Sequence, residues 1–417
     1  MVFPINVIRR KFRKVFLSDI SPSSTVARLE RSWSIRKTIS KIENHKFTFT
    51  DLQYLLDFVI ICFVFFVVEQ PGTLVKLSIG VLFTFALLIP ITSQFFFPFL
   101  PIATWLLLFY SCRFIPASWR PPIWVRVLPS LETILYGDNL SNVLAGKNSP
   151  VLDILAWIPY GLVHFGAPFV CSALIFLFAS PGTLPVFARS FGYMNLIGVA
   201  IQLFFPCSPP WYENLYGLVP ATYDVKGSPG GLARVDQILG LDLYTSSFTA
   251  SPVVFGAFPS LHSGCATLEV LFMSFVFPRL TPVLNGYVLW IWWSTMYLTH
   301  HYFIDLIGGA LLSISVFYLV SRNYLPAVQG DKSSRWAYDY IQLANEPPRM
   351  KARLTEEFTK SAEGGFSSLL ETSLASSPND SSSSDWEIKT LADTDEFSRA
   401  FGNAGKSTSM KEKSPFE

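Results

Sequence analysis

One long stretch of the chain, residues 51–325, carries very little charge. It holds ten Lys/Arg and twelve Asp/Glu, whereas a soluble globular protein of ordinary composition carries about 25% charged residues. A water-exposed domain of that length needs a more polar surface, so a soluble fold is excluded for this stretch. Nucleic-acid binding is also disfavoured, because it needs a clustered basic face within a folded domain. The sequence predicts that residues 51–325 lie mainly in a lipid bilayer.

The apolar residues of this stretch are grouped in runs of the length that a membrane helix requires. A bilayer core is crossed by about 20 predominantly apolar residues in a helix. Eight runs approach that length, although several are short or end in proline, and they lie near 52–69, 73–90, 94–112, 154–178, 190–206, 264–278, 285–303 and 306–321. The pattern predicts an all-α, polytopic membrane protein with about eight spans, within a range of six to eight.

The two flanking segments differ in charge. Residues 1–50 hold eleven Lys/Arg and three acidic residues, which is typical of a basic arm on a cytosolic membrane surface. The positive-inside bias places this arm in the cytosol, and eight spans return the C-terminus to the same side. Residues 326–417 are polar and Ser-rich, and from about residue 355 they are predicted to form a disordered cytosolic tail. Residues 51–325 are then the membrane domain that carries the function.

The loops on the non-cytosolic side contain seven of the ten cations of the membrane domain, against the same bias. This excess indicates either that the orientation is inverted or that this side binds an anion, and we favour the anion. The segment 207–260 carries Lys226 and Arg234 and is rich in Pro and Gly. A long loop without secondary structure is usually functional in a compact protein. Together with Arg113 and Arg120, these two cations are the predicted ligands of the anion.

Three of the five histidines fall in two short segments, FPSLHSG with His262 and THHYFIDLIGG with His300 and His301. His301 and Asp305 are four residues apart, so on a helix they share one face. A carboxylate there fixes the imidazole tautomer and leaves the other ring nitrogen as a nucleophile or a base. His300 points about 100° away on such a helix and is not expected to share the site. The spacing also counts against a two-histidine metal site.

Two other interpretations of this pattern are open. His301 and Asp305 alone could be a buried polar pair that joins helices, but a second histidine at a span end, His262, favours a catalytic site. A transporter with a proton relay is the second alternative, and it predicts internal repeats and polar residues near the middle of the membrane. His164 stands alone inside an apolar run and is predicted to be a packing residue.

The segments around the histidines resemble motifs of the type 2 phosphatidic-acid phosphatase superfamily. Pro259 to His262 resembles its PSGH motif, with Leu261 in place of Gly. Ser294 to Asp305 resembles its motif S-R-x5-H-x3-D, with Thr295 in place of the phosphate-binding Arg. The first motif of the superfamily, K-x6-R-P, has a counterpart in Arg113-x6-Arg120-Pro121, with Arg for Lys. The resemblance implies a helical core of that superfamily and adds Ser260 and Ser294 to the candidate binding residues.

Longer stretches resemble one branch of sphingolipid-headgroup transferases, the fungal inositol phosphorylceramide synthases, over about residues 50–325. These stretches are FYSCRFIPASWRPPIWVRVLPSLE, FPCSPPWYENLYG, GSPGGLAR, FGAFPSLHSG and WWSTMYLTHHYFID. The resemblance implies transfer of inositol phosphate from phosphatidylinositol to ceramide on the lumenal side of the Golgi membrane. It also implies His262, His301 and Asp305 as catalytic residues, no metal or other cofactor, and a small membrane regulatory subunit as partner. A lipid phosphate phosphatase and a sphingomyelin-type synthase are the alternatives within the enzyme class.

Overall fold

The computed structural model describes residues 27–338 and 340–343, so residues 1–26 of the predicted basic arm and most of the Ser-rich tail lie outside the described residues. The described residues form helices joined by loops, with no β-strand among them and three isolated β-bridges. The predicted all-α fold is therefore confirmed. Within the predicted arm, the structure describes one exposed helix, α2 (Ile35–Glu43).

Each of the eight apolar runs coincides with a helix or a pair of consecutive helices. These are α3 (Leu52–Val67), α4 (Thr73–Leu88), α5 (Pro90–Ser111), α8 (Pro150–Trp157) with α9 (His164–Phe178), α10 (Thr183–Phe204), α14 (Leu261–Val276), α15 (Thr281–Tyr297) and α16 (Phe303–Asn323). Among the residues that the structure describes, five helical segments are long and apolar enough to cross a membrane, at 49–67, 90–114, 150–178, 183–204 and 303–323. The chain is thus a multi-pass membrane protein, and its count of eight spans remains a prediction.

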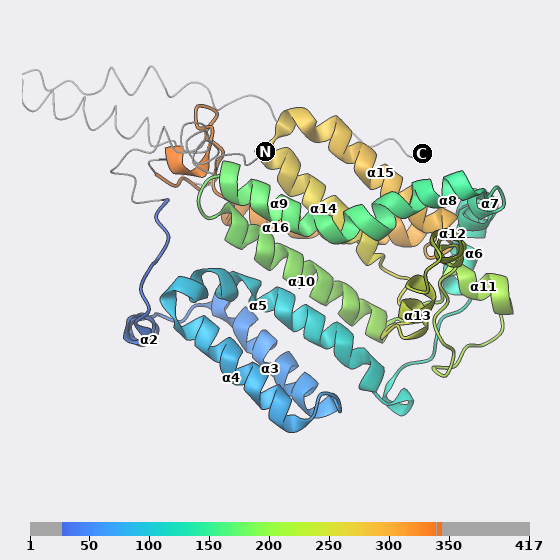
Figure 1. Ribbon diagram of the computed structural model, residues 1–417, viewed down its shortest axis with the longest axis horizontal. Helices are drawn as coiled ribbons and strands as arrows, with labels where there is room; N and C mark the ends of the chain where they lie inside the picture. The colour runs from blue at the N-terminus through green and yellow to red at the C-terminus, as the bar shows by residue number, and fades with distance from the viewer. Residues whose placement is uncertain (1–26, 339, 344–417) are drawn as a thin grey trace, which may run out of the picture. The chain divides into compact units, whose positions relative to one another are not determined.

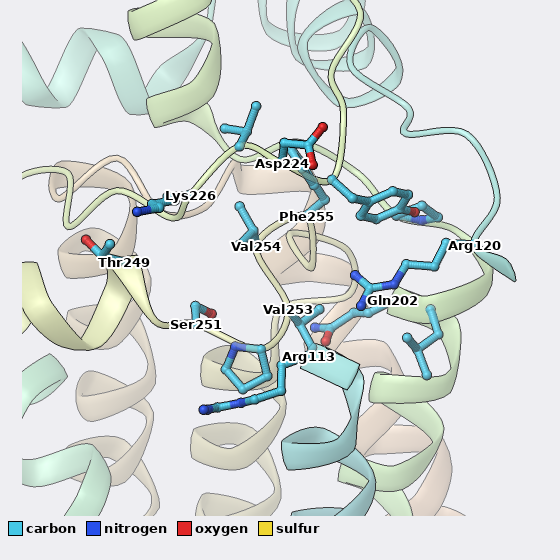
Figure 2. A pocket seen from close by; sticks show the side chains of 15 residues that line it. Arg113, Arg120, Gln202, Asp224, Lys226, Thr249, Ser251, Val253, Val254 and Phe255 are labelled. Atoms are coloured by element: carbon cyan, nitrogen blue, oxygen red, sulfur yellow. The ribbon is translucent and has the colours of Figure 1, made fainter. Parts of the chain in front are cut away.

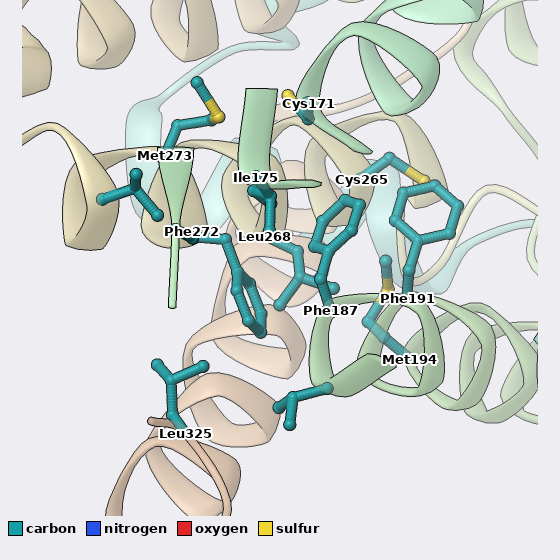
Figure 3. Packing of buried hydrophobic residues seen from close by; sticks show 13 residues of the cluster. Cys171, Ile175, Phe187, Phe191, Met194, Cys265, Leu268, Phe272, Met273 and Leu325 are labelled. Carbon is teal, nitrogen blue, oxygen red and sulfur yellow. The ribbon is translucent and has the colours of Figure 1, made fainter. Parts of the chain in front are cut away.

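The centre of the helical bundle is an apolar core between α9, α10, α14 and α16 (Figure 3). Phe187 on α10 packs edge-to-face against Phe272 on α14, with 5.1 Å between the ring centroids. Phe272 in turn meets Phe317 on α16. Edge-to-face pairs of this kind stabilise a core beyond the area that they bury. They fix α14 and α16, whose N-termini carry the candidate catalytic residues.

Helices α14 and α16 pack with almost no space between their backbones. A Cβ atom at Gly309 on α16 would overlap the carbonyl oxygen of Ser260, so only glycine fits there. Two hydroxyl groups join the same pair of helices: Ser263 Oγ donates to Leu306 O at 2.6 Å, and Ser313 Oγ donates to Gly264 O at 2.6 Å. The relative position of the two N-termini is therefore tightly determined.

Most of the short helices, though not α2, gather at one end of the long ones, as Figure 1 shows. They are α6 (Val127–Tyr136), α7 (Leu140–Ala145), α11 (Pro210–Tyr216), α12 (Leu232–Leu239) and α13 (Tyr244–Thr249). The expectation of a structureless 207–260 loop is thus wrong, because three of these helices lie within it. Backbone hydrogen bonds from Trp124 N to Pro206 O (2.8 Å) and from Trp211 N to Thr299 O (3.0 Å) join the two loop regions to the ends of α10 and α15. The predicted anion-binding loops and the histidine segments therefore share one face.

Candidate active site

His301 and Asp305 lie at the N-terminus of α16. The Asp305 side chain caps this helix, because its Oδ2 accepts a hydrogen bond from the backbone N–H of Tyr302 at 3.0 Å. His301 precedes the helix, and its Nδ1 lies 3.1 Å from Asp305 Oδ1. The two side chains meet as expected, although they do not share a helix face. The imidazole N–H is not aligned with the carboxylate oxygen, as is common for catalytic contacts that tighten when substrate binds.

His262 faces His301 from the first turn of α14. Its Nδ1 lies 3.1 Å from Nε2 of His301, and the two rings are 5.2 Å apart at their centroids. Ser260 N-caps α14, with its Oγ accepting from Ser263 N at 3.3 Å, and its own backbone N–H donates to Asp305 O at 3.0 Å. The segments before the two helices are thereby joined, and three titratable side chains form one cluster, in which His301 and Asp305 are buried and His262 is half-buried.

His300 lies beside this cluster, and its side chain contacts Pro229 and Phe248. The helical angle from which its direction was predicted does not apply, because residues 298–302 lie between α15 and α16. Thr299 has a φ of 63°, in the left-handed region that a β-branched residue rarely adopts, and this conformation reverses the chain after α15. His300 Nε2 lies 3.0 Å from Pro229 O, and its ring stacks on Phe248 with 4.5 Å between centroids.

Two residues of the third long span, Tyr160 and His164, contact His262, and their role in the cluster was not predicted from the sequence. The Tyr160 ring stacks on His262 with a centroid distance of 4.6 Å and an interplanar angle of 22°, and the His164 ring lies at 4.8 Å from the same imidazole. Tyr160 also stacks on His300 at 5.5 Å. Both residues depend on a π-helical turn, Ile158–Val163, which links α8 to α9. π-Turns are frequent at functional sites, but no residue pattern in the sequence marks this one.

A buried glutamate, Glu132 on α6, supports the first turn of α16 from the opposite side. Its Oε1 accepts a hydrogen bond from Ile304 N at 2.9 Å, and its Oε2 accepts from Leu140 N at 3.4 Å. Burial raises the pKa of this carboxyl group, while the two backbone N–H groups act in the opposite direction. Glu132 thus positions the backbone next to Asp305. It is 172 residues from Ile304 in sequence, so no local pattern predicts the contact.

Three of the four predicted cations line a single pocket. Arg113, Arg120 and Lys226 surround a cavity of about 200 Å³ together with Gln202 of α10, residues 223–225, Thr249 and residues 251–255 (Figure 2). Arg234 is not among the lining residues. Its guanidinium forms a bidentate contact with Asp153, with Nη2 2.7 Å from Oδ1, and the Asp153 carboxylate raises the pKa of Arg234.

The two predicted serines are buried, and their hydroxyl groups have partners within their own helices. Ser260 caps α14, as described above, and Ser294 Oγ donates to Trp290 O at 2.8 Å within α15. Thr295, which follows Ser294, likewise donates to Trp292 O at 3.0 Å. These hydrogen bonds stabilise the N-terminus of α14 and the last turns of α15.

The chain is an all-α membrane protein whose residues 126–319 match the PAP2 superfamily, and its named relatives place it among the membrane phosphotransferases. The chain belongs to the inositol phosphorylceramide synthase family, as three relatives show. It is 56% identical to the inositol phosphorylceramide synthase catalytic subunit of Schizosaccharomyces pombe, over 75% of this chain and 74% of that protein.

The other two relatives are similar over comparable lengths. The inositol phosphorylceramide synthase of Candida albicans is 52% identical over 79% of this chain and 70% of that protein. The catalytic subunit of the Saccharomyces cerevisiae enzyme is 50% identical over 79% of this chain and 82% of that protein. No solved structure matches the chain.

Proposed function

We propose that this protein transfers inositol phosphate from phosphatidylinositol to the primary hydroxyl of ceramide and releases diacylglycerol. The observation that carries the chemistry is the 3.1 Å contact between His262 Nδ1 and His301 Nε2, with Asp305 on the far side of His301. The relatives, which are named inositol phosphorylceramide synthases, support the choice of substrates. The protein acts as a phosphotransferase in sphingolipid biosynthesis.

The proposed reaction has two displacements at phosphorus. His301 Nε2 attacks, the P–O bond to diacylglycerol breaks, and His262 gives its proton to the departing oxygen. The ceramide hydroxyl then gives its proton to His262, its oxygen attacks phosphorus, and the P–N bond to His301 breaks. Direct transfer is the alternative. In it, His301 accepts the proton of the ceramide hydroxyl while the hydroxyl oxygen of ceramide displaces diacylglycerol from phosphorus. Asp305 orients the His301 ring in both schemes.

The developing charge on the phosphoryl oxygens requires cationic donors, as in phosphoryl transfer generally. We assign this role to Arg113, Arg120 and Lys226, because all three line one pocket on the face that carries the histidines. Arg234, Ser260 and Ser294 stay predicted binding residues, and their contacts with Asp153, Ser263 N and Trp290 O favour a positioning role.

The proposed location is the Golgi membrane, with the active site in the lumen and both termini in the cytosol. The basic character of residues 1–50 and the eight helical runs support this orientation. A small membrane regulatory subunit is the proposed partner, since two of the relatives are named as catalytic subunits. We assign residues 51–325 to the catalytic membrane domain and residues 1–50 and 326–417 to the cytosolic flanks.

Product analysis after incubation of the purified full chain with fluorescent ceramide tests the function. Phosphatidylinositol as donor should give inositol phosphorylceramide and diacylglycerol in equal amounts. Phosphatidylcholine in place of phosphatidylinositol should give no product, which separates this function from that of a sphingomyelin-type synthase. Phosphatidic acid should release no inorganic phosphate, which separates it from a lipid phosphate phosphatase. The absence of transfer from phosphatidylinositol would reject the proposal.

A further inference from the structure

The pocket of Figure 2 combines fixed positive charge with groups that accept hydrogen bonds. Arg120 is held in place by two backbone carbonyls: its Nε donates to Ile115 O at 3.1 Å and its Nη2 donates to Cys112 O. Its guanidinium also lies over the Tyr223 ring, 4.8 Å from the centroid. A guanidinium has five N–H donors, so this arrangement leaves others for an anion in the pocket. The cation is oriented before any ligand binds.

Tyr223 itself is fixed and does not compete for the anion. Its hydroxyl donates to Pro121 O at 2.8 Å, and burial raises its pKa, although the nearby Arg120 has the opposite effect. Pro121 directly follows Arg120 in the chain. The Tyr223 ring, over which the Arg120 guanidinium lies, is thus joined to the backbone next to Arg120. This keeps the positive charge at one place in the pocket wall.

Three lining residues add hydrogen-bond acceptors beside these cations. Gln202 is buried, and its Nε2 donates to Pro259 O at 3.0 Å, which leaves the amide oxygen as an acceptor. The Thr249 hydroxyl donates to Thr245 O at 2.7 Å and so has only lone pairs to offer a ligand. Asp224 contributes a carboxylate that accepts from Thr222 Oγ1 at 3.3 Å and keeps further acceptor capacity.

This mixture does not suit a simple anion. The Asp224 carboxylate repels inorganic phosphate and partly offsets the attraction of the three cations. A ligand with a phosphate and several hydroxyl groups pairs its phosphate with the cations and its hydroxyl groups with the hydrogen-bond acceptors. The cavity of about 200 Å³ is smaller than the pockets of about 300–1,000 Å³ that hold drug-sized ligands, so it suits a small polar headgroup. The chemistry of the wall is thus that of a phosphorylated polyol.

Two contacts join this pocket to the histidine cluster. Gln202 holds the carbonyl of Pro259, three residues before His262. Thr249 follows Phe248, whose ring stacks on His300. A headgroup held by these walls is therefore next to the segments that carry the catalytic side chains.

We propose that this pocket selects the donor lipid by its polyol headgroup, with Asp224, Gln202 and Thr249 accepting hydrogen bonds from ring hydroxyls while Lys226, Arg113 and Arg120 hold the phosphate. The inference rests on the proposed function and adds the residues that distinguish inositol from other headgroups. Asp224 recognises hydroxyl groups in this scheme, and Lys226 recognises charge. The two residues can therefore be tested separately.

The test measures binding and turnover with the purified full chain and its Asp224→Asn and Lys226→Gln variants. Asp242→Asn is the matched control, because Asp242 is an exposed carboxylate of the same 207–260 segment that accepts from Ser246 Oγ at 2.9 Å outside the pocket. Calorimetric titration with myo-inositol 1-phosphate should show binding that Asp224→Asn weakens about fivefold and Lys226→Gln about tenfold. With inorganic phosphate as ligand, only Lys226→Gln should weaken binding relative to the wild type.

Turnover should show the same division. Asp224→Asn should raise the KM for phosphatidylinositol and leave the KM for ceramide within about twofold. Lys226→Gln should raise the same KM and also lower kcat, because Lys226 is assigned to the charge that develops on the phosphoryl oxygens. Equal myo-inositol 1-phosphate binding by the wild type, both pocket variants and the control would overturn the inference, as would an absence of binding to the wild type. Failure of the proposed function has a different signature, because the wild type would then bind myo-inositol 1-phosphate but form no inositol phosphorylceramide from phosphatidylinositol.

Discussion

His262 Nδ1 and His301 Nε2 lie 3.1 Å apart, so each imidazole is the nearest polar partner that the other has for its reactive nitrogen. Only one proton fits between two nitrogens at that distance. If His301 Nδ1 carries a proton toward Asp305, His301 Nε2 is the acceptor and His262 Nδ1 is the donor. This order of tautomers makes His301 the nucleophile or base and His262 the proton carrier. A phosphoryl group must then enter by separating the two rings.

The catalytic assignment predicts a graded loss of activity. His262→Ala should lower kcat about 10²–10⁴-fold, the usual contribution of a general acid–base, and His301→Ala should be at least as severe. Asp305→Asn should be milder than His301→Ala if the carboxylate only orients the ring. Transfer assays on folded, membrane-inserted variants check this order. Wild-type turnover in either histidine variant would refute the assignment.

The stacking of Tyr160 on His262 predicts a second graded effect. Tyr160→Leu removes the ring that restrains the imidazole and should lower kcat up to about tenfold, since aromatic pairs contribute about 0.5–1.5 kcal/mol. Tyr160→Phe keeps the ring and should retain most of the activity. The comparison requires kcat at saturating concentrations of both lipids. Equal kcat values for the two variants would show that the stack does not position His262.

His300 is expected to support stability more than chemistry. His300→Ala removes both the contact with Pro229 O and the stack on Phe248, which together should lower the free energy of unfolding by about 1–3 kcal/mol. Activity at low temperature should persist, because the side chain is not in the chain of contacts from Asp305 to His262. Thermal unfolding in detergent and a transfer assay at reduced temperature check the two parts. A variant that melts like the wild type but is inactive would contradict this role.

The hydrogen bond between Glu132 on α6 and Ile304 N on α16 predicts that a substitution in α6 disturbs the first turn of α16. Glu132→Ala leaves the partly buried N–H of Ile304 without its acceptor and should destabilise the protein by about 1 kcal/mol or more. Glu132→Gln keeps one carbonyl acceptor and should be milder. Because the same turn carries Asp305, both variants should lower kcat more than they change either KM. Glu213→Gln is a suitable comparison, since Glu213 accepts from Asn139 Nδ2 and Tyr302 Oη and not from the backbone of α16.

The sidedness of the active site is also testable. Glycosylation acceptors placed in the exposed part of residues 207–260 should be modified, and an acceptor near Ser381 should not, if the histidine face is lumenal. Modification is read as a mobility shift that glycosidase removes. The opposite pattern would place catalysis in the cytosol. The grouping of both loop regions with the histidines on one face means that a single accessible position reports on the whole site.

Sequence patterns predict what depends on composition and local spacing. The apolar runs predict the long helices, and the histidine segments predict which side chains meet, since His301 and Asp305 are close in sequence. The angle assigned to His300 was wrong because it assumed helical geometry for a segment that Thr299 turns through a left-handed conformation. The contacts of Tyr160 and Glu132 depend on packing between distant segments, which hydrophobic periodicity does not contain.

The close packing of α14 against α16 has a consequence for how lipids reach the histidines. Gly309 fits against the Ser260 carbonyl without space for a methyl group, and two serine hydroxyls join the helices, so this side of the site is a fixed wall. On the other side, Tyr160 and His164 of the segment 150–178 meet His262 through ring contacts. The same segment is held by Asp153, which contacts Arg234 at 2.7 Å and accepts a hydrogen bond from Tyr297 Oη at 2.8 Å. Both lipids therefore have to reach the histidines without separating α14 from α16.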